Sequence, residues 1–311
     1  MTCPFQFTIY KNGLKSYRDL PIRYAETSTL FRNEASGEMH GLIRVRQFTI
    51  SEGHIVCTAN QLQEEFNKVI DLINFMLNAL GLHDSVTYRF SKGDINDKVN
   101  FIDAPEAWIK TEALMKNILD DLGLKYEEAV GEAAFYGPKL DVQTKNVYGK
   151  EDTIITVQID FLLAERFEMS YVDENGEKKY PFAIPGPSIG CYERTLAMLI
   201  EKYAGALPLW ISPVQVKVLS LTDRTIKDAL ELTDKLRSYG IRAEADTRNE
   251  KIGYKIREAQ LNKINYMLII GDKEAENGVV AVRSRNSGDL GTMTFDQFKD
   301  KIIDEIQKRT L

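Results

Sequence analysis

The sequence predicts two domains of different fold class, an α+β domain on an antiparallel sheet over residues 1–208 and an α/β domain over residues 209–311. Before residue 208, strand-like and helical segments follow one another without strict alternation, an order typical of α+β domains. After it, strands and helices alternate, which favours a mostly parallel sheet. The run Ala-Gly-Ala-Leu-Pro at 204–208 separates the two patterns.

The elements of the first domain follow from apolar spacing and turn residues. Two short apolar-rich runs at 30–34 and 41–49, with turn-forming residues between them, predict an antiparallel hairpin. Apolar residues at helical spacing predict a helix from Leu62 to Gly81, with Thr58 and Gln61 as a capping box. The remaining elements are a helix from Pro105 to about Gly123, strands at 139–144, 153–161 and 180–184, and a helix at 192–203.

The second domain has the predicted order β-α-β-α-β-β-α. Its recognisable strands lie at 214–221, 241–247, 266–270 and 277–283, and its helices at 223–239, 251–263 and 295–309. We expect these elements to build a mostly parallel five-stranded sheet covered by helices.

Composition sets broad limits on function. The net charge of −6 gives no overall sign of nucleic-acid binding, although residues 209–311 carry 18 Lys and Arg against 16 Asp and Glu. The longest apolar runs are far shorter than a membrane span, so we expect no membrane association. Three widely spaced cysteines and the lack of an export signal point to the cytoplasm.

The predicted hairpin concentrates charged and aromatic side chains. Arg32 and Glu34 would point to one face of the first strand, because side chains alternate along a strand. Arg44, Arg46 and Phe48 would share a face of the second. Guanidinium groups suit phosphate oxygens and an aromatic face suits a nucleobase. A solvated sheet face with scattered salt bridges is the alternative, which the alternation alone does not exclude.

A second candidate lies where an apolar strand passes into a helix, at Gly190-Cys-Tyr-Glu-Arg194. An arginine in the first helical turn meets the positive end of the helix dipole, and a bound anion nearby would relieve that repulsion. The alternative is an exposed arginine paired with Glu193 or Glu201.

Taken together, these segments resemble the class II aminoacyl-tRNA synthetases, whose Arg-x-Glu, loop, Arg-x-x-x-Phe pattern and later Glu-Arg pair are both present. The strings resemble threonyl-tRNA synthetases in particular, in the same order along nearly the whole chain. They are Leu14 to Pro21, His40 to Arg46, Ala134 to Lys139, Val157 to Phe161, Pro213 to Val216 and Arg248 to Glu258.

The resemblance implies a threonine–tRNA ligase that uses ATP with Mg²⁺, threonine and threonine tRNA. It implies catalytic roles for Arg32 and Arg194, which would hold the α- and γ-phosphates. The implied ATP-binding residues are Arg32, Glu34, Arg44, Phe48, Lys139 and Arg194. The implied threonine-binding residues are Tyr136, Gln158 and Glu52. The implied domains are a catalytic core at 1–208 and an anticodon-binding domain at 209–311.

In the second domain the resemblance implies a surface that reads unstacked anticodon bases. Amide, guanidinium and carboxylate groups can all hydrogen-bond to base edges. The implied residues are Asn249, Arg257, Glu274 and Arg283.

The chain departs from the family at a zinc site that is expected to grip the amine and hydroxyl of threonine. Such a site needs three protein ligands and one open position. Cys3 and His54 match two ligands, but Pro185 stands where the third, a histidine, is expected, and Gly186 replaces an arginine. Zinc binding is therefore an open question. Ile50 and Glu52 also differ from the Gln and Asp of many members.

The chain also starts at a stretch that is internal in the family. The first class II motif, which builds the homodimer interface of family members, has no match here. The ATP-site residues favour a threonine–tRNA ligase. Pro185 and the start of the chain favour the alternative, a catalytically impaired relative that binds tRNA or a protein partner.

Overall fold

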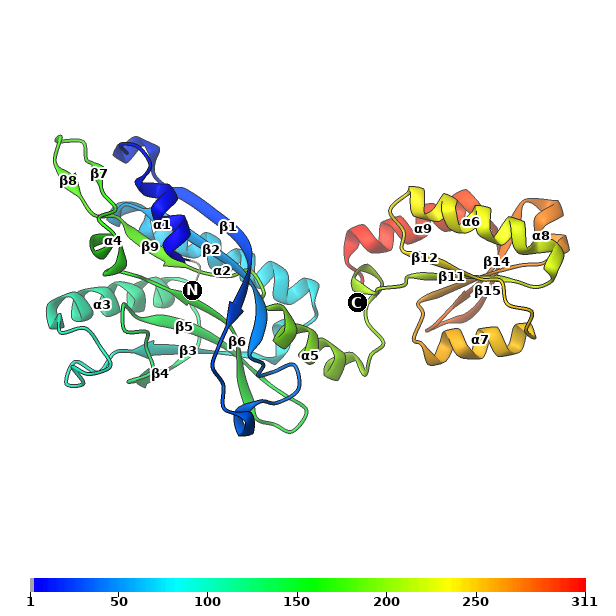
Figure 1. Cartoon of the computed structure of the whole chain (residues 1–311), viewed down its shortest axis with the longest axis horizontal. Helices are drawn as coiled ribbons and strands as arrows, with labels where there is room; N and C mark the ends of the chain where they lie inside the picture. The colour runs from blue at the N-terminus through cyan, green and yellow to red at the C-terminus, as the bar shows by residue number, and fades with distance from the viewer. Residues whose placement is uncertain (1–2) are drawn as a thin grey trace. The chain divides into compact units, whose positions relative to one another are not determined.

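The computed structural model describes residues 3–311, and the chain divides into two compact units, Met1–Met198 and Leu199–Leu311 (Figure 1). Helix α5 (Tyr192–Tyr203) carries the chain from one unit into the next. The division by contacts falls within α5, whereas the turn-forming run predicts a boundary at residue 208, so that boundary stays a prediction.

The first unit begins with a four-stranded antiparallel sheet. Its strands are β1 (Ile22–Phe31), β2 (Gln47–Cys57), β9 (Phe182–Pro185) and β10 (Gly190–Cys191). β1 pairs with one edge of β2, while β9 and β10 share the other edge. The two long strands are rich in Ile, Val and Thr, which suits a pleated, half-buried surface. Residues 186–189 interrupt the second edge between β9 and β10.

A second four-stranded sheet continues the first. In spatial order its strands are β4 (Tyr126–Val130), β3 (Val86–Lys92), β5 (Lys139–Lys145) and β6 (Glu151–Gln158). Just beyond β6, Asp160 and Ala183 of β9 exchange backbone hydrogen bonds of 2.8 and 3.2 Å. The predicted antiparallel character is confirmed for these strands, with one exception: β3 and β4 are parallel. A small hairpin, β7 (Tyr171–Val172) and β8 (Lys178–Lys179), stands apart.

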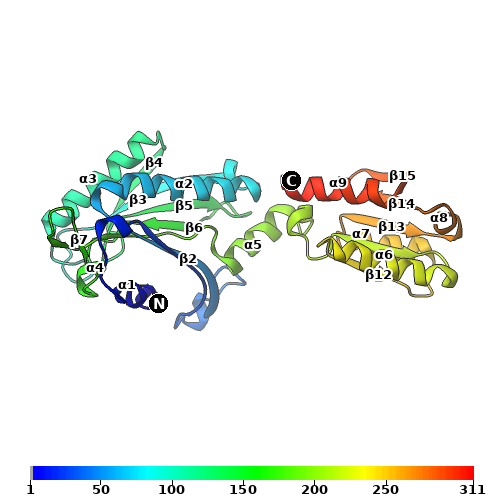
Figure 2. The ribbon, with the colours of Figure 1, turned by 90° about the horizontal axis from the view of Figure 1, so that it is seen from above.

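Four α-helices precede α5 among the described residues of the first unit. They are α1 (Cys3–Lys11), α2 (Leu62–Ala79), α3 (Pro105–Asp121) and the short α4 (Leu163–Arg166). Figures 1 and 2 show α1 and α2 on opposite sides of the β1–β2 pair. Phe7 and Tyr10 of α1 are buried in a cluster with Val56 and Ala183. α2, α3 and α5 begin at the predicted residues, and Gln61 Oε1 accepts the Thr58 N–H at 3.0 Å, half of the predicted capping box.

The predicted hairpin forms, but its strands end earlier than expected. Arg32, Glu34, Arg44 and Arg46 all lie in the connecting loop, residues 32–46, and not on strands. A side chain takes the place of a main-chain partner at one of the carbonyl groups that a longer strand ladder would have paired, and a second side chain binds the Glu34 carboxylate. Arg46 Nε donates to the Glu34 carbonyl oxygen at 3.0 Å, and Arg44 Nε donates to the Glu34 carboxylate at 3.0 Å. The prediction that these residues share strand faces is therefore wrong.

The second unit has one five-stranded sheet in the order β12-β11-β13-β14-β15. The strands are β11 (Val216–Ser220), β12 (Ala243–Asp246), β13 (Tyr266–Ile270), β14 (Val279–Ser284) and β15 (Gly288–Thr294). β12, β11 and β13 are parallel, but β14 and β15 join antiparallel, so the sheet is mixed and the predicted mostly parallel five-stranded sheet is confirmed only in part. The reason is that the connection from β14 to β15 is a tight hairpin, which can join only antiparallel strands.

Helices cover both faces of this sheet. They are α6 (Ile226–Ser238), α7 (Ile252–Leu261), α8 (Asp272–Asn277) and α9 (Phe295–Lys308). Figure 1 shows α6 and α9 on one face and α7 on the other. Val218 and Phe298 belong to the core on the first face, and Leu219 and Ala259 to the core on the second. Across residues 3–311, no helix is long and apolar enough to cross a membrane.

Several elements have no clear signal in the sequence: α1, β3, β4, α8 and β15. β4 is the clearest case. Its sequence, Tyr-Glu-Glu-Ala-Val, has little apolar periodicity, and none of its five side chains is fully buried. Pairing with β3 holds it in place. Tertiary contacts therefore decide these elements, not local preference.

The joint between the two sheets depends on one glycine, which we expect to be irreplaceable. Gly190 has a φ of +72°, and an added Cβ would lie 2.1 Å from the Ile154 carbonyl oxygen. Gly190→Ala should lower the free energy of unfolding of the first unit by more than about 3 kcal/mol, since a left-handed backbone and overpacking each cost about 1–3 kcal/mol. Urea unfolding followed by Trp108 fluorescence in a Trp210→Phe background would measure this.

Gly131→Ala is the matched control. Gly131 has a similar φ of +83° but nothing within 4 Å of an added Cβ. It should cost only about 1 kcal/mol, the backbone part of the effect. Equal losses for the two variants would contradict a role for the close approach between Gly190 and Ile154.

Candidate active site

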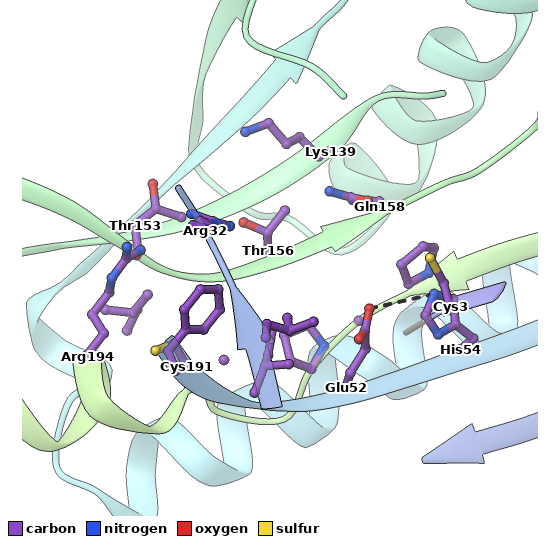
Figure 3. A pocket seen from close by; sticks show the side chains of 18 of the residues that line it. Cys3, Arg32, Glu52, His54, Lys139, Thr153, Thr156, Gln158, Cys191 and Arg194 are labelled. Carbon is purple, nitrogen blue, oxygen red and sulfur yellow. Dashed lines mark hydrogen bonds and ion pairs between the residues drawn. The ribbon is translucent and has the colours of Figure 1, made fainter. Parts of the chain in front are cut away.

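A cavity of about 520 Å³ opens where the two sheets of the first unit meet. β2, β5, β6 and β9 contribute to its walls, together with the loop 32–46 and the start of α5. Most of the first-unit residues that the sequence singles out line this cavity, Arg46 being an exception: Cys3, Arg32, Glu34, Arg44, Phe48, Glu52, His54, Tyr136, Lys139, Gln158, Pro185 and Arg194. Figure 3 shows many of them pointing into the space from opposite sides.

One end of the cavity has an arginine stacked on an aromatic ring. The Arg32 guanidinium lies over the Phe48 ring, 5.0 Å from its centroid. Phe48 is on β2 and buried, and the Arg32 backbone N–H donates to the Arg46 carbonyl oxygen at 2.8 Å. This backbone hydrogen bond closes the loop 32–46 at its base, next to Arg32. A planar cation beside an aromatic face can hold a phosphate and a flat ring together.

A carboxylate at the same end is tied to a second arginine. Arg44 Nη2 lies 2.9 Å from Glu34 Oε2 and 3.5 Å from Glu38 Oε1. The hydrogen bond from Arg44 holds the pKa of Glu34 below its usual value, so this carboxylate stays ionised near neutral pH. Its carbonyl oxygen is also occupied, by Arg46. Glu34 therefore organises the loop in this state and keeps Arg44 at the cavity wall.

Arg194 anchors the helix end of the cavity to two distant segments. Its Nη1 donates to the Thr153 carbonyl oxygen at 2.6 Å and its Nε to the Ile43 carbonyl oxygen at 3.2 Å. The carboxylate of Glu193 instead accepts the Thr49 backbone N–H, at 3.0 and 2.9 Å. The ion pair between Arg194 and Glu193, one of the alternatives that the sequence left open, therefore does not form. Two carbonyl dipoles offset the unfavourable position of Arg194 at a helix start.

The other end of the cavity is a polar wall on β5 and β6. The Tyr136 hydroxyl makes a very short hydrogen bond to Gln158 Oε1, and burial raises the pKa of Tyr136. Lys139 Nζ lies 2.9 Å from Asp141 Oδ2, on the strand that pairs with β6. Asp141 is buried and also accepts the Thr156 hydroxyl at 2.6 Å. This wall presents a phenol, an amide and an ammonium group, all held in place from behind.

The implied zinc position does not fit a zinc ion. His54 on β2 faces Pro185 on β9 in the strand register, and proline has no ligand atom. Cys3 and His54 both line the cavity, so only two of the three implied ligands are present there. Among residues 3–311, no three His, Cys, Asp or Glu side chains are placed to hold a metal. The residues present therefore fall short of the three ligands that such a site needs.

His54 is held in a polar chain behind the cavity. Burial lowers its pKa to about 4, so the ring is neutral near pH 7. Its Nδ1 is 2.8 Å from Gln6 Oε1, and Gln6 Nε2 donates to Glu26 Oε1 at 2.8 Å. Its Nε2 lies 3.9 Å from Glu52 Oε1, which is no ion pair for a neutral ring (Figure 3). Nothing in the sequence pattern marks Gln6 or Glu26, since they come from α1 and β1.

Asp160 is a further buried group in this cavity. One carboxylate oxygen accepts the backbone N–H groups of Leu162 and Leu163, at 2.9 and 2.8 Å. The other, Oδ2, has no partner within the described residues. Burial raises the pKa of Asp160 to about 6. The residue belongs to the resembling string Val157 to Phe161, but only its depth in the structure singles it out.

The four residues that the resemblance implies for reading the anticodon lie in the second unit, outside the first-unit cavity. Asn249 follows β12 and Glu274 follows β13, both at the carboxyl edge of the parallel strands, while Arg257 is exposed on α7. Arg283 is on β14, opposite Met267, nearer the other edge. Its Nε has no hydrogen-bond partner among residues 3–311. Glu274 Oε2 accepts the Gly271 N–H at 3.0 Å and so caps α8.

Two family models match most of the chain. The tRNA synthetase class II core domain (G, H, P, S and T) matches residues 1–203, and the anticodon binding domain matches residues 215–305. The first match alone covers more than half of the chain.

Curated relatives give the same result at the sequence level. A threonine–tRNA ligase of Clostridium perfringens is 60% identical over 309 residues, which is 99% of this chain and 48% of the relative. A threonine–tRNA ligase of Staphylococcus carnosus is 46% identical over 308 residues, 99% of this chain and 47% of the relative. The chain thus spans about half the length of the curated relatives it matches.

Solved structures agree with this assignment. The RNA binding domain of threonyl-tRNA synthetase from Cryptosporidium parvum Iowa II superposes with a TM-score of 0.90 at 34% identity, over 98% of this chain and 75% of that one. The putative threonyl-tRNA synthetase ThrRS-1 of Aeropyrum pernix, with a TM-score of 0.80 at 23% identity, shares the fold over 100% of this chain and 75% of its own. The chain therefore belongs to the class II tRNA synthetase family, with threonyl-tRNA synthetases as its relatives.

Proposed function

We propose that this chain carries the activity of a threonine–tRNA ligase: ATP-dependent activation of threonine and transfer to threonine tRNA in the cytoplasm. We assign residues 1–208 to the catalytic core and 209–311 to the anticodon-binding domain. One observation carries the proposal. A cationic end with Arg32 on Phe48 and a polar end with Tyr136 and Gln158 share one cavity, in a chain 60% identical to a threonine–tRNA ligase over 99% of its length.

ATP with its Mg²⁺ would occupy the end that holds Arg32, Phe48 and Arg194. Adenine would stack on the Phe48 ring, either on the face opposite Arg32 or on the face that Arg32 covers. Glu34 would accept a hydrogen bond from the base. Arg32 would hold the α-phosphate, and Arg44 and Arg194 the other phosphates. Guanidinium groups held in fixed positions stabilise charge that develops in a transition state without reorganising. Mg²⁺, bound together with ATP, would supply positive charge against the phosphates.

Threonine would lie at the other end, against Tyr136, Gln158 and Glu52. Its carboxylate would attack the α-phosphorus of ATP in line, forming threonyl-adenylate and releasing pyrophosphate. The 3′-terminal ribose of the tRNA would then attack the carbonyl carbon and release AMP. The main contribution of the protein is positioning, because the reactants need only be held at contact distance and in line. Lys139, held by Asp141, would face the adenylate.

The second unit would bind the anticodon of threonine tRNA through Asn249, Arg257, Glu274 and Arg283. Exposed polar side chains at the edge and on α7 can hydrogen-bond to unstacked bases. The unpartnered Nε of Arg283 supports this role, since a buried guanidinium nitrogen without a partner favours a ligand that accepts from it.

Loss of Arg32 should abolish most of the activation step. We expect threonine-dependent ATP–pyrophosphate exchange by the purified chain, and a fall of about 100-fold in kcat/KM for Arg32→Ala, the typical loss on removing one charge-stabilising group. Arg18→Ala, which removes an exposed arginine remote from the cavity, should stay within twofold of the parent. No exchange by the parent chain, with ATP binding intact, would contradict the proposed activity.

Loss of Arg283 should weaken tRNA binding and its specificity. Filter binding of a threonine tRNA transcript should show about tenfold lower affinity for Arg283→Ala, because a base contact is worth about 1–3 kcal/mol. Lys227→Ala removes a cation from exposed α6, on the other face of the sheet, and should leave the affinity unchanged. If both variants bind alike, or if an altered anticodon does not weaken the parent, Arg283 has no role in reading the anticodon.

A further inference from the structure

We propose, building on the proposed function, that the amino-acid end of this cavity works without zinc: the ammonium group of threonine donates hydrogen bonds directly to His54 Nε2 and to the carboxylate of Glu52. Both acceptors line the cavity wall. They are two residues apart on the same strand, β2, and so point to the same face. Three features of the site support this assignment: the missing third ligand, the orientation of His54 and the distance between the two acceptors.

Both the backbone position and the side chains of residues 185–187 exclude a third zinc ligand from this segment. Pro185 is the last residue of β9 and is paired with His54 in the strand register. The next residue, Gly186, donates its N–H to the Gly53 carbonyl oxygen at 3.0 Å, so the backbone is fixed beside β2. Neither Pro185 nor Gly186 has a side-chain donor atom, and Pro187 follows. A third zinc ligand cannot come from this segment.

The orientation of His54 follows from a chain of hydrogen bonds. Gln6 Nε2 donates to Glu26 Oε1 at 2.8 Å, so the Gln6 amide oxygen is turned toward His54. That oxygen lies 2.8 Å from His54 Nδ1 and can only accept, so Nδ1 is the nitrogen that donates. An imidazole with its proton on Nδ1 presents Nε2 as an acceptor. Gln6 and His54 are 4% and 2% exposed, so water does not compete for these bonds.

The gap between the acceptors fits an ammonium group. His54 Nε2 and Glu52 Oε1 are 3.9 Å apart, too far for a direct hydrogen bond and both acceptors in any case. A nitrogen with three N–H donors could sit about 2.8 Å from each of them at once. The carboxylate also neutralises the positive charge of the ammonium group. Glu52 and His54 are thereby specificity-determining residues, since they require a protonated amine on the substrate.

The test measures threonine binding and metal content on the full chain. Metal content is read by mass spectrometry of the purified protein, and threonine binding by equilibrium dialysis in EDTA and with one equivalent of Zn²⁺. We expect no stoichiometric zinc, and an affinity for threonine that differs by less than twofold between the two conditions. 3-Hydroxybutyrate, which lacks the ammonium group, should bind at least tenfold more weakly. Copurified zinc with binding abolished by EDTA would overturn the proposal.

Variants separate the two acceptors from general folding effects. Glu52→Gln should weaken threonine binding about tenfold or more, as expected for a charge-assisted hydrogen bond. Glu64→Gln removes a carboxylate that is 71% exposed on α2 and should leave it unchanged. Pro185→His supplies a third ligand and should bind zinc, which verifies the metal assay. Equal affinity of Glu52→Gln and the parent would overturn the role of Glu52 even if the variant folds normally.

Binding of an ATP probe in parallel distinguishes this inference from the proposed function. If a fluorescent ATP analogue binds to the parent and not to Arg32→Ala, while threonine needs zinc or does not bind at all, only the zinc-free ammonium site is wrong. If neither ATP nor threonine binds, the ligase proposal fails and this inference fails with it. ATP binding together with zinc-independent threonine binding supports both.

Discussion

The close approach of β10 to β6 is the constraint on which the site depends. Gly190 lets the backbone pass against the Ile154 carbonyl oxygen, and Asp160 and Ala183 join the two sheets a few residues away. The cavity walls come from both sheets, so any side chain at this position would separate the two halves of the site. Only a residue without Cβ permits the contact, and its positive φ adds a second reason for glycine.

Cations gather at one end of the cavity, and neighbouring groups of the protein compensate for their charge. Arg44 is paired with Glu34, and Arg194 donates to two main-chain carbonyl groups from β6 and the loop 32–46. Arg32 lies on Phe48 instead. These contacts hold each guanidinium in place at modest cost, since fixed partners leave little to reorganise when phosphates arrive. The loop and the helix end are thus organised before the proposed substrate binds.

At the opposite end, the chain keeps the supports of a ligand site while its metal ligands are incomplete. The chain of bonds from Glu26 through Gln6 still orients His54, although Pro185 faces it. A buried polar group is costly unless it is paired. The proposed ammonium contact would pair His54 Nε2, the ring nitrogen on the side of Glu52. It also explains a carboxylate so close to the imidazole.

The sequence by itself determined the family, the helices α2, α3 and α5, and the set of residues around the cavity, because these depend on local apolar spacing and on short strings of residues. It did not determine that the arginines of 32–46 lie in a loop, since alternation cannot tell where side chains replace a ladder. It predicted a mostly parallel sheet in the second domain, whereas β14 pairs antiparallel with β13, and β15, which has no clear signal in the sequence, pairs antiparallel with β14 through a tight turn. Gln6, Glu26 and Asp160 emerged only from tertiary structure, because burial and partners from distant segments give them their roles.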